Sequence, residues 1–166
     1  MGEVFDDEVR AFLHSGCALI IATVAEDGAP HAGRCWGLDV LSDATADGDE
    51  EVRVRVLVDA EDPATIEHVA AGGLVAVTAT SVVTMRSLQL KGRSLGVDPA
   101  TEEDVARGAR YCAEFFRDIE RTDDTPRPII ESLEPVGYVS FTASIDQVFD
   151  QTPGPLAGAA IDGRSR

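Results

Sequence analysis

Short apolar runs, some with strict alternation of apolar and polar residues, dominate the chain and predict a protein built mainly from β-strands. The run Ala18–Val24 is too short for a typical core helix, and it leads into the hairpin signal Asp27-Gly28. Residues 52–58 place valine at every second position, and residues 74–80 are rich in side chains that suit a packed, pleated surface. Further strands are expected at 31–41, 87–91 and 136–143, the last with an extension through 145–149.

Three segments carry the periodicity or the capping signals of helices. Residues 4–15 combine apolar positions at helical spacing with an acidic first turn, and Gly16 follows as the expected stop. Asp62-Pro63 is a cap followed by proline at the first helical position, and it predicts a short helix that ends at Gly72-Gly73. Thr101 opens a longer helix whose apolar stripe is expected to pack in the core: Val105, Ala109, Cys112, Phe116 and Ile119.

About six strands and three helices without strict βαβ alternation favour a mainly β fold with peripheral helices, as a closed or split antiparallel barrel. The 166 residues most simply form one domain, 1–166, around one core. Within it, residues 1–16 carry the N-terminal helix, and residues 154–166 form a tail that we expect to be flexible unless a partner subunit holds it. Residues 121–135, with three prolines, are expected to connect elements over the surface.

The charge balance narrows the classes of partner. The chain has 30 acidic and 14 basic residues and a formal net charge of −16, so neither nucleic acid nor an anionic membrane is an expected partner. No apolar stretch reaches the ~18 residues of a membrane span, and the N-terminus lacks the basic start of a signal peptide. A cytoplasmic protein is therefore expected. Three cysteines without C-x-x-C spacing and three scattered histidines give little support for a metal site.

One segment stands out because it combines alternation with positive charge: Met85-Arg86-Ser87-Leu88-Gln89-Leu90-Lys91-Gly92. Lys91 is the only lysine of the chain, and Arg86 and Arg93 flank it. Such donors on a rigid strand are what an anionic group, for example a phosphate, requires. Spacing alone leaves a second interpretation open, in which these are ordinary solvent-facing residues of an edge strand, where charge protects against aggregation.

The strand expected at 31–41 carries Arg34 and Trp36 on one face and two glycines on the other. Glycines inside a strand indicate a bend, or the close approach of another backbone or of a flat ligand. For Trp36, the only tryptophan, packing in the core or at a dimer interface is favoured over stacking on a ligand ring, because aromatic bulk most often serves packing.

Three segments resemble the pyridoxamine 5'-phosphate oxidase-like split-barrel family. Met85 to Gly92 resembles the family's strand that carries an arginine and a polar residue toward FMN and ends in a glycine. Cys17 to His31 is similar to its first hairpin, in which an apolar strand ends in a threonine, an Asp-Gly turn and a proline. Asp150 to Pro155, together with Gly158, resembles a tail found in one uncharacterised branch. The matches keep the family's order and span most of the chain.

The resemblance implies a six-stranded antiparallel split β-barrel of the FMN-binding type, and a homodimer whose flavins lie in clefts shared by two chains. It places Arg86 and Ser87 at cofactor contacts, with Gln89 and Lys91 as further candidates on the face of Ser87. Arg34 lies near the family's arginine of the second strand, one residue out of register unless a bulge intervenes. Trp36 completes the set of candidate cofactor-binding residues. No residue is identified as catalytic.

The function that follows from the resemblance is FMN binding, with a flavin-dependent oxidoreductase related to pyridoxamine 5'-phosphate oxidase favoured and its small-molecule substrate unknown. The alternative is a non-catalytic module that holds flavin, deazaflavin or haem on the same barrel, and a third interpretation is a relative without cofactor. One departure affects the phosphate: the connection Asp59 to Ala64 is acidic where the family's oxidases present a Ser-Arg-Lys-like group. Residues that bind pyridoxamine phosphate have no clear match, so that substrate is not predicted.

Overall fold

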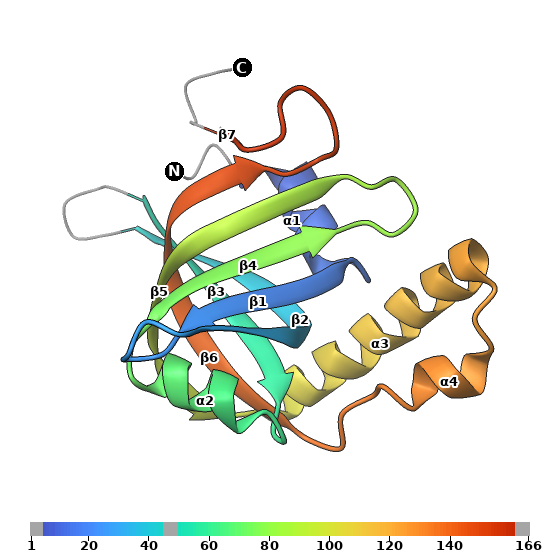
Figure 1. Ribbon diagram of the computed structural model, residues 1–166, viewed down its shortest axis with the longest axis horizontal. Helices are drawn as coiled ribbons and strands as arrows, with labels where there is room; N and C mark the ends of the chain where they lie inside the picture. The colour runs from blue at the N-terminus through green and yellow to red at the C-terminus, as the bar shows by residue number, and fades with distance from the viewer. Residues whose placement is uncertain (1–4, 45–49, 162–166) are drawn as a thin grey trace.

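The structure is a computed structural model that describes residues 5–44 and 50–161. Six antiparallel strands form a barrel, in the order β3-β2-β1-β4-β5-β6, and β6 pairs with β3 to close it (Figure 1). The strands are β1 (Ala18–Val24), β2 (Pro30–Ala44), β3 (Glu50–Asp59), β4 (Leu74–Thr80), β5 (Ser87–Pro99) and β6 (Tyr138–Asp150). The predicted mainly β fold, a six-stranded antiparallel split barrel, is confirmed.

The described helices lie around the barrel, with α3 beside β2 and α2 at one end of the strands (Figure 1). They are α1 (Asp7–His14), α2 (Pro63–Ala70), α3 (Glu102–Asp123) and α4 (Arg127–Glu131). Side-chain caps start three of them: Asp62 caps α2 and Thr101 forms a capping box with Asp104 on α3, where the sequence predicts helix starts, and Asp6 caps α1. No helix in residues 5–44 and 50–161 is long and apolar enough to cross a membrane.

Inside the barrel, alternate residues of every strand fill one core. On β1 the buried positions are Leu19, Ile21 and Thr23, whereas the residues between them face outward. The largest fully buried side chains of the other strands include Val54, Val56, Val77, Leu90 and Phe141. This period of two places every second residue of β1, β4 and the first half of β5 on the outer face of the barrel.

Several elements are longer than their sequence patterns predict. β5 continues to Pro99 and β6 runs without interruption from Tyr138 to Asp150, because bulges at Lys91/Gly92 and Ser94/Val97 let the two strands stay paired. The expected surface connector contains α4. The tail returns as β7 (Ala159–Ala160), paired with Phe149 and Asp150 of β6, while residues 162–166 lie outside the described part of the chain.

The predicted buried stripe of α3 is partly wrong. Val105 is 50% exposed, and the face that packs consists mainly of neighbouring positions: Asp104, Gly108, Tyr111, Cys112, Phe115 and Phe116. The rotation follows from two contacts that periodicity does not encode. Asp104 is held by Arg55 of β3 through hydrogen bonds of 2.7 to 3.1 Å, and Gly108 makes room for the ring of Tyr138.

Gly16 has a different role from the predicted helix stop. Helix α1 ends at His14, and Ser15 caps it with backbone angles in the extended region. A side chain at Gly16 would overlap the backbone of Glu114 and Phe115. The glycine therefore permits α3 to lie directly against the start of β1.

Candidate functional site

The outer face of β1, β4 and β5 is an open sheet surface whose side chains fall into cross-strand rows. Antiparallel register brings outward residues of neighbouring strands opposite one another. One row contains Arg34, Ile20, Thr78, Gln89 and Phe149, from β2 to β6. The next row contains Ala32, Ala22, Ala76, Lys91 and Gln147. Four of the sequence-predicted site residues, Arg34, Ser87, Gln89 and Lys91, thus lie on one sheet face.

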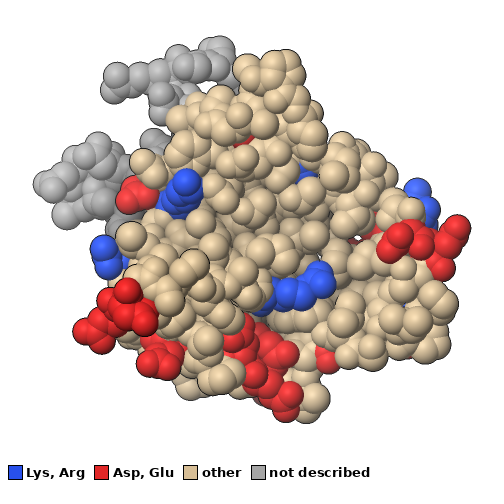
Figure 2. Space-filling view, in the orientation of Figure 1, with Lys and Arg blue, Asp and Glu red and all other residues tan. Residues whose placement is uncertain are grey.

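Small side chains give this face a shallow hollow. A cavity of about 360 Å³ lies over Ala22 and Ala76, between Val24, Leu74 and Lys91. Ile20, Val24 and Leu74 are 42, 44 and 57% exposed, so one side of the hollow is apolar, whereas Lys91, Asp146 and Gln147 line its other side. Figure 2 shows the same face with few charged side chains near its centre and with acidic groups gathered toward its margins. In a protein of net charge −16, a face with few acidic side chains repels an anionic partner less than the acid-rich margins do (Figure 2).

Arg34 lies at the border between this face and α3. Its guanidinium lies 5.3 Å from the ring of Trp36 and 5.0 Å from the ring of Phe115. Its Nε is buried without a hydrogen-bond partner, and within residues 5–44 and 50–161 the side chain has neither a hydrogen bond nor an ion pair. Two aromatic rings therefore fix a cation whose donors are unused.

Trp36 packs in the interior. It is 3% exposed and meets Tyr111 edge to face, with ring centroids 6.3 Å apart. The strand bends just after it, because the register with β3 shifts between Cys35 and Leu38, and Gly37 has a φ of 150°. The favoured sequence interpretation, packing, agrees with this placement, and a role of Trp36 in cofactor binding stays a prediction.

Lys91 is another cation of the face without an acidic partner among the described residues, as is Arg93, whose Nη1 donates to the carbonyl of Gly72 at 2.8 Å. Its Nζ lies 4.5 Å from the centroid of the Phe149 ring. The glycine that follows it, Gly92, is required by the fold, because any side chain there would overlap the backbone of Ser144 on β6. The bulge between Lys91 and Gly92 brings β6 this close.

Arg86 and Ser87 are engaged by the protein itself. Arg86 Nη1 lies 2.7 Å from Oε1 of Glu8, and its guanidinium lies 4.9 Å from the ring of Phe12, so it ties the β4–β5 hairpin to α1. Ser87 is buried, its hydroxyl is 2.7 Å from that of Thr80, and its N–H donates to Thr152 Oγ1 at 3.0 Å. Their role in cofactor binding stays a prediction.

Sequence reasoning missed two polar residues of the face, Thr78 and Gln151. Gln89 Nε2 donates to Thr78 Oγ1 at 3.0 Å, and Gln151 Nε2 donates to Gln89 Oε1 at 3.4 Å. The signal for Thr78 was present, because pairing of residues 74–80 with 87–93 places it opposite Gln89. Gln151 could not be found this way, since it joins the face through the tail that follows β6.

The acidic connection after β3 has a structural explanation. Asp62 accepts hydrogen bonds from the backbone N–H and hydroxyl of Thr65, at 3.1 and 2.6 Å. Burial opposes its ionisation, but these hydrogen bonds outweigh burial and lower the pKa of the Asp62 carboxyl. The capped end of α2 packs on β2 at Gly33, where a side chain would meet Asp62 and Thr65. The carboxylate thus serves the helix, and the connection Asp59 to Ala64 offers no cationic side chain to an anionic ligand.

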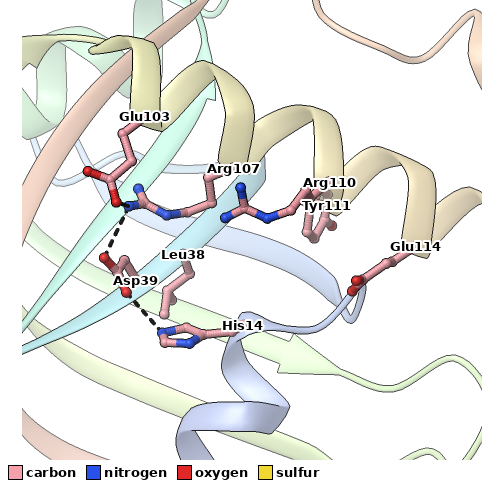
Figure 3. A pocket seen from close by; sticks show the side chains of 8 residues that line it. All are labelled: His14, Leu38, Asp39, Glu103, Arg107, Arg110, Tyr111 and Glu114. Carbon is pink, nitrogen blue, oxygen red and sulfur yellow. Dashed lines mark hydrogen bonds and ion pairs between the residues drawn. The ribbon is translucent and has the colours of Figure 1, made fainter.

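A second cavity, of about 190 Å³, lies between α1, β2 and α3 (Figure 3). Asp39 stands at its centre, 3.0 Å from His14 Nε2 on one side and 3.0 Å from Arg107 Nη2 on the other. Arg107 also contacts the buried Asp104 at 2.7 Å. His14, Asp39 and Arg107 thus pair with one another, and this cavity lies at a structural junction between three elements. The open sheet face is therefore the stronger candidate site.

No protein-family model matches the sequence, and no curated protein matches it. Solved structures share its fold. HupZ from Group A Streptococcus superimposes with a TM-score of 0.53 at 12% identity, covering 93% of this chain and 99% of that one. An F420 reductase superimposes with a TM-score of 0.51 at 15% identity, covering 84 and 94% of the two chains.

A pyridoxamine 5'-phosphate oxidase-related, FMN-binding protein from Nostoc punctiforme also aligns, at 13% identity over 92% of this chain and 86% of that one. Its TM-score of 0.46 is too low to add to the argument. At such identities a likeness shows the fold alone, and the function has to come from the site.

Proposed function

We propose that the protein binds an anionic, flat redox cofactor, FMN or a related flavin, on the outer face of β1, β4 and β5, and works as a flavin-dependent oxidoreductase. The observation that carries the proposal is the unpartnered guanidinium of Arg34 beside a shallow, mainly apolar hollow that is also lined by Lys91 and Asp146. A buried donor left unsatisfied costs about 1 to 3 kcal/mol, so such a group points to a ligand that completes it. A phosphate suits a guanidinium because it accepts two parallel hydrogen bonds.

The spacing of the two free cations fits such a ligand. Arg34 lies on β2 and Lys91 on β5, three strand spacings away in the sheet, and the two residues lie in adjacent cross-strand rows. Standard strand spacing and rise give a distance of roughly 16 Å between their Cα atoms. A tricyclic ring with a ribityl phosphate tail can bridge this span. Ala22 and Ala76 leave room for the ring plane, Arg34 would hold the phosphate, and Lys91 would face the edge of the ring where negative charge develops on reduction.

The face supplies the remaining needs of flavin chemistry, which are shape and electrostatics. A bound flavin provides the hydride and electron transfer itself, so no general acid or base from the protein is required. Apolar side chains at Ile20, Val24 and Leu74 would exclude water from the ring. The electron donor and the substrate are not specified by these residues.

A homodimer is part of the proposal. A hollow on one sheet face leaves the far side of a flat ligand in solvent, whereas small-molecule sites bury about 70 to 90% of their ligand. The chain carries a net charge of −16, so two copies repel each other except where acidic side chains are absent. The β1/β4/β5 face comes near both requirements, because it exposes Ile20, Val24 and Leu74, and Asp146 is the one acid among the residues that line its hollow.

A deazaflavin is the second candidate ligand, because a solved structure of the same fold is described as an F420 reductase. It has the same tricyclic shape and a phosphate in its tail, so it would use the same residues. Titrations of the purified protein with FMN and with F420 decide between them. Tighter binding of F420 than of FMN would identify the cofactor as a deazaflavin, bound by the same residues.

The test of the site compares FMN with riboflavin, which has the same ring and no phosphate. We expect Arg34→Met, which keeps an apolar chain between the two rings, to raise the dissociation constant of FMN at least about tenfold, the value of a charged hydrogen bond. Riboflavin binding should stay unchanged. Arg117→Ala, on the exposed side of α3, is the matched control. Equal FMN affinity in the Arg34 variant and the unsubstituted protein would remove Arg34 as the phosphate ligand.

A further inference from the structure

A chain of amide and hydroxyl groups crosses the candidate face from the tail to β4. Gln151 Nε2 donates to Gln89 Oε1 at 3.4 Å, and Gln89 Nε2 donates to Thr78 Oγ1 at 3.0 Å. Both ends of the Gln89 amide are therefore occupied, and its orientation is fixed by its neighbours. All three residues are half-buried, so water screens these hydrogen bonds only in part.

The direction of these hydrogen bonds decides whether the Thr78 hydroxyl can act as a donor to a ligand. A hydroxyl has one hydrogen, and here its oxygen already accepts the N–H of Gln89. In residues 5–44 and 50–161 no acceptor receives the hydrogen of Thr78. The next outward threonine of the strand, Thr80, is different, because its hydroxyl is paired with that of Ser87 at 2.7 Å.

The position of Thr78 directs that hydrogen to the ligand face. Thr78 stands between Ile20 and Gln89 in the row that begins with Arg34, and one row away from the alanines of the hollow. A ring seated on Ala76 lies next to it. A free donor at the margin of an apolar hollow is the kind of group that fixes the orientation of a flat ligand.

We infer that Thr78 donates a hydrogen bond to the ring of the ligand, and that Gln89 and Gln151 are positioning residues that hold Thr78 in the donor state. The inference rests on the proposed function. It specifies the ligand further: the edge that meets β4 carries a neutral acceptor, such as a carbonyl oxygen or an unprotonated ring nitrogen. A ligand with an N–H at this point would compete with Gln89 for the Thr78 oxygen and bind less well.

Substitution of Thr78 separates this contact from the phosphate contact of Arg34. Thr78→Val keeps the shape and removes the donor, and we expect it to weaken FMN and riboflavin equally, by about fivefold, the value of one neutral hydrogen bond. The visible spectrum of the bound flavin should shift, since a hydrogen bond to the ring is lost. Thr78→Ser should restore both the affinity and the spectrum, and Thr80→Val should leave both unchanged.

A double-mutant cycle tests the positioning role of Gln89. Gln89→Leu should weaken flavin binding less than Thr78→Val does, and should add no further loss when the two are combined, because its effect passes through Thr78. Losses that add independently would overturn the positioning role. If the unsubstituted protein binds flavin and Thr78→Val changes neither the affinity nor the spectrum, the role of Thr78 is overturned while the proposed function stands. Absence of binding of both flavins to the unsubstituted protein would overturn the proposed function.

Discussion

At the scale of single residues, the structure separates cations that serve the fold from cations that are available. Arg55, Arg86 and Arg107 each meet a carboxylate within 3.0 Å. Arg34 and Lys91 instead rest on aromatic rings and have no acidic partner within the part of the chain that the structure describes. With 30 acidic residues in the chain, two cations on one face that have neither an ion pair nor a hydrogen bond among the described residues are the clearest local indication of an anionic ligand.

The ion pair of Arg55 with Asp104 gives a stability prediction. Asp104 is 1% exposed and also binds Arg107 and the cap residue Thr101. Asp104→Ala would remove the buried carboxylate that lies 2.7 Å from both Arg55 and Arg107 and leave them with longer ion pairs, such as those to Asp98 and Asp39, and we expect it to lower the free energy of unfolding by about 3 kcal/mol. Urea denaturation measures this value. Asp98→Ala is the control, because Asp98 is exposed and its contact with Arg55 is longer, at 3.4 Å. A decrease in the free energy of unfolding as large as that of Asp104→Ala would contradict the account.

The same carboxylate predicts how stability depends on pH. Burial opposes its ionisation, but hydrogen bonds from Arg55 and Thr101 outweigh burial and hold the pKa of Asp104 well below its usual range. A lowered folded-state pKa contributes stability that is fully present above the unfolded value of about 3.9 and is lost as pH falls below it. As pH falls from about 5 to 2, the free energy of unfolding should therefore decrease less in Asp104→Asn than in the unsubstituted protein. Parallel curves would contradict this assignment.

At the scale of elements, the sequence was sufficient for the strands that alternate and for the capped helix starts. Ala18–Val24 and Leu74–Thr80 have the predicted bounds, because buried strands with β-branched residues carry their own signal. The buried face of α3 was not predictable, since it depends on Asp104 and Gly108 meeting residues of β3 and β6. Arg34 was predictable as a candidate, but its lack of a partner was not, because this depends on where α3 places Phe115.

The packing of α3 against the start of β1 gives a prediction at this scale. Gly16→Ala would force apart the backbones of β1 and α3, and overpacking of this kind costs about 1 to 3 kcal/mol. Thermal unfolding should show the corresponding decrease in the melting temperature. Gly137→Ala is the matched control, because a Cβ there meets only Ala60 at an ordinary 3.7 Å. Equal melting temperatures for both variants would show that α3 does not lie this close to Gly16.

At the scale of the whole molecule, charge and shape together define one face for assembly. Leu74 is 57% exposed at the edge of the hollow, so Leu74→Glu changes the proposed dimer surface without removing a core side chain. We expect this variant to shift the sedimentation coefficient from dimer to monomer and to lose flavin affinity with it, since each site needs the second copy as a cover. Val105→Glu, on the exposed side of α3, should change neither property. A Leu74→Glu variant that stays dimeric would place the interface elsewhere.

The most direct measurement is a fluorescence titration of FMN with the purified, unsubstituted protein, in parallel with riboflavin. If Arg34 and the hollow over Ala22 and Ala76 form the site, one FMN binds per chain and riboflavin binds at least about tenfold more weakly, by the loss of the phosphate contact. Equal affinity for the two flavins would contradict the role of Arg34, and a flavin signal unchanged by the protein would contradict the proposed function as a whole.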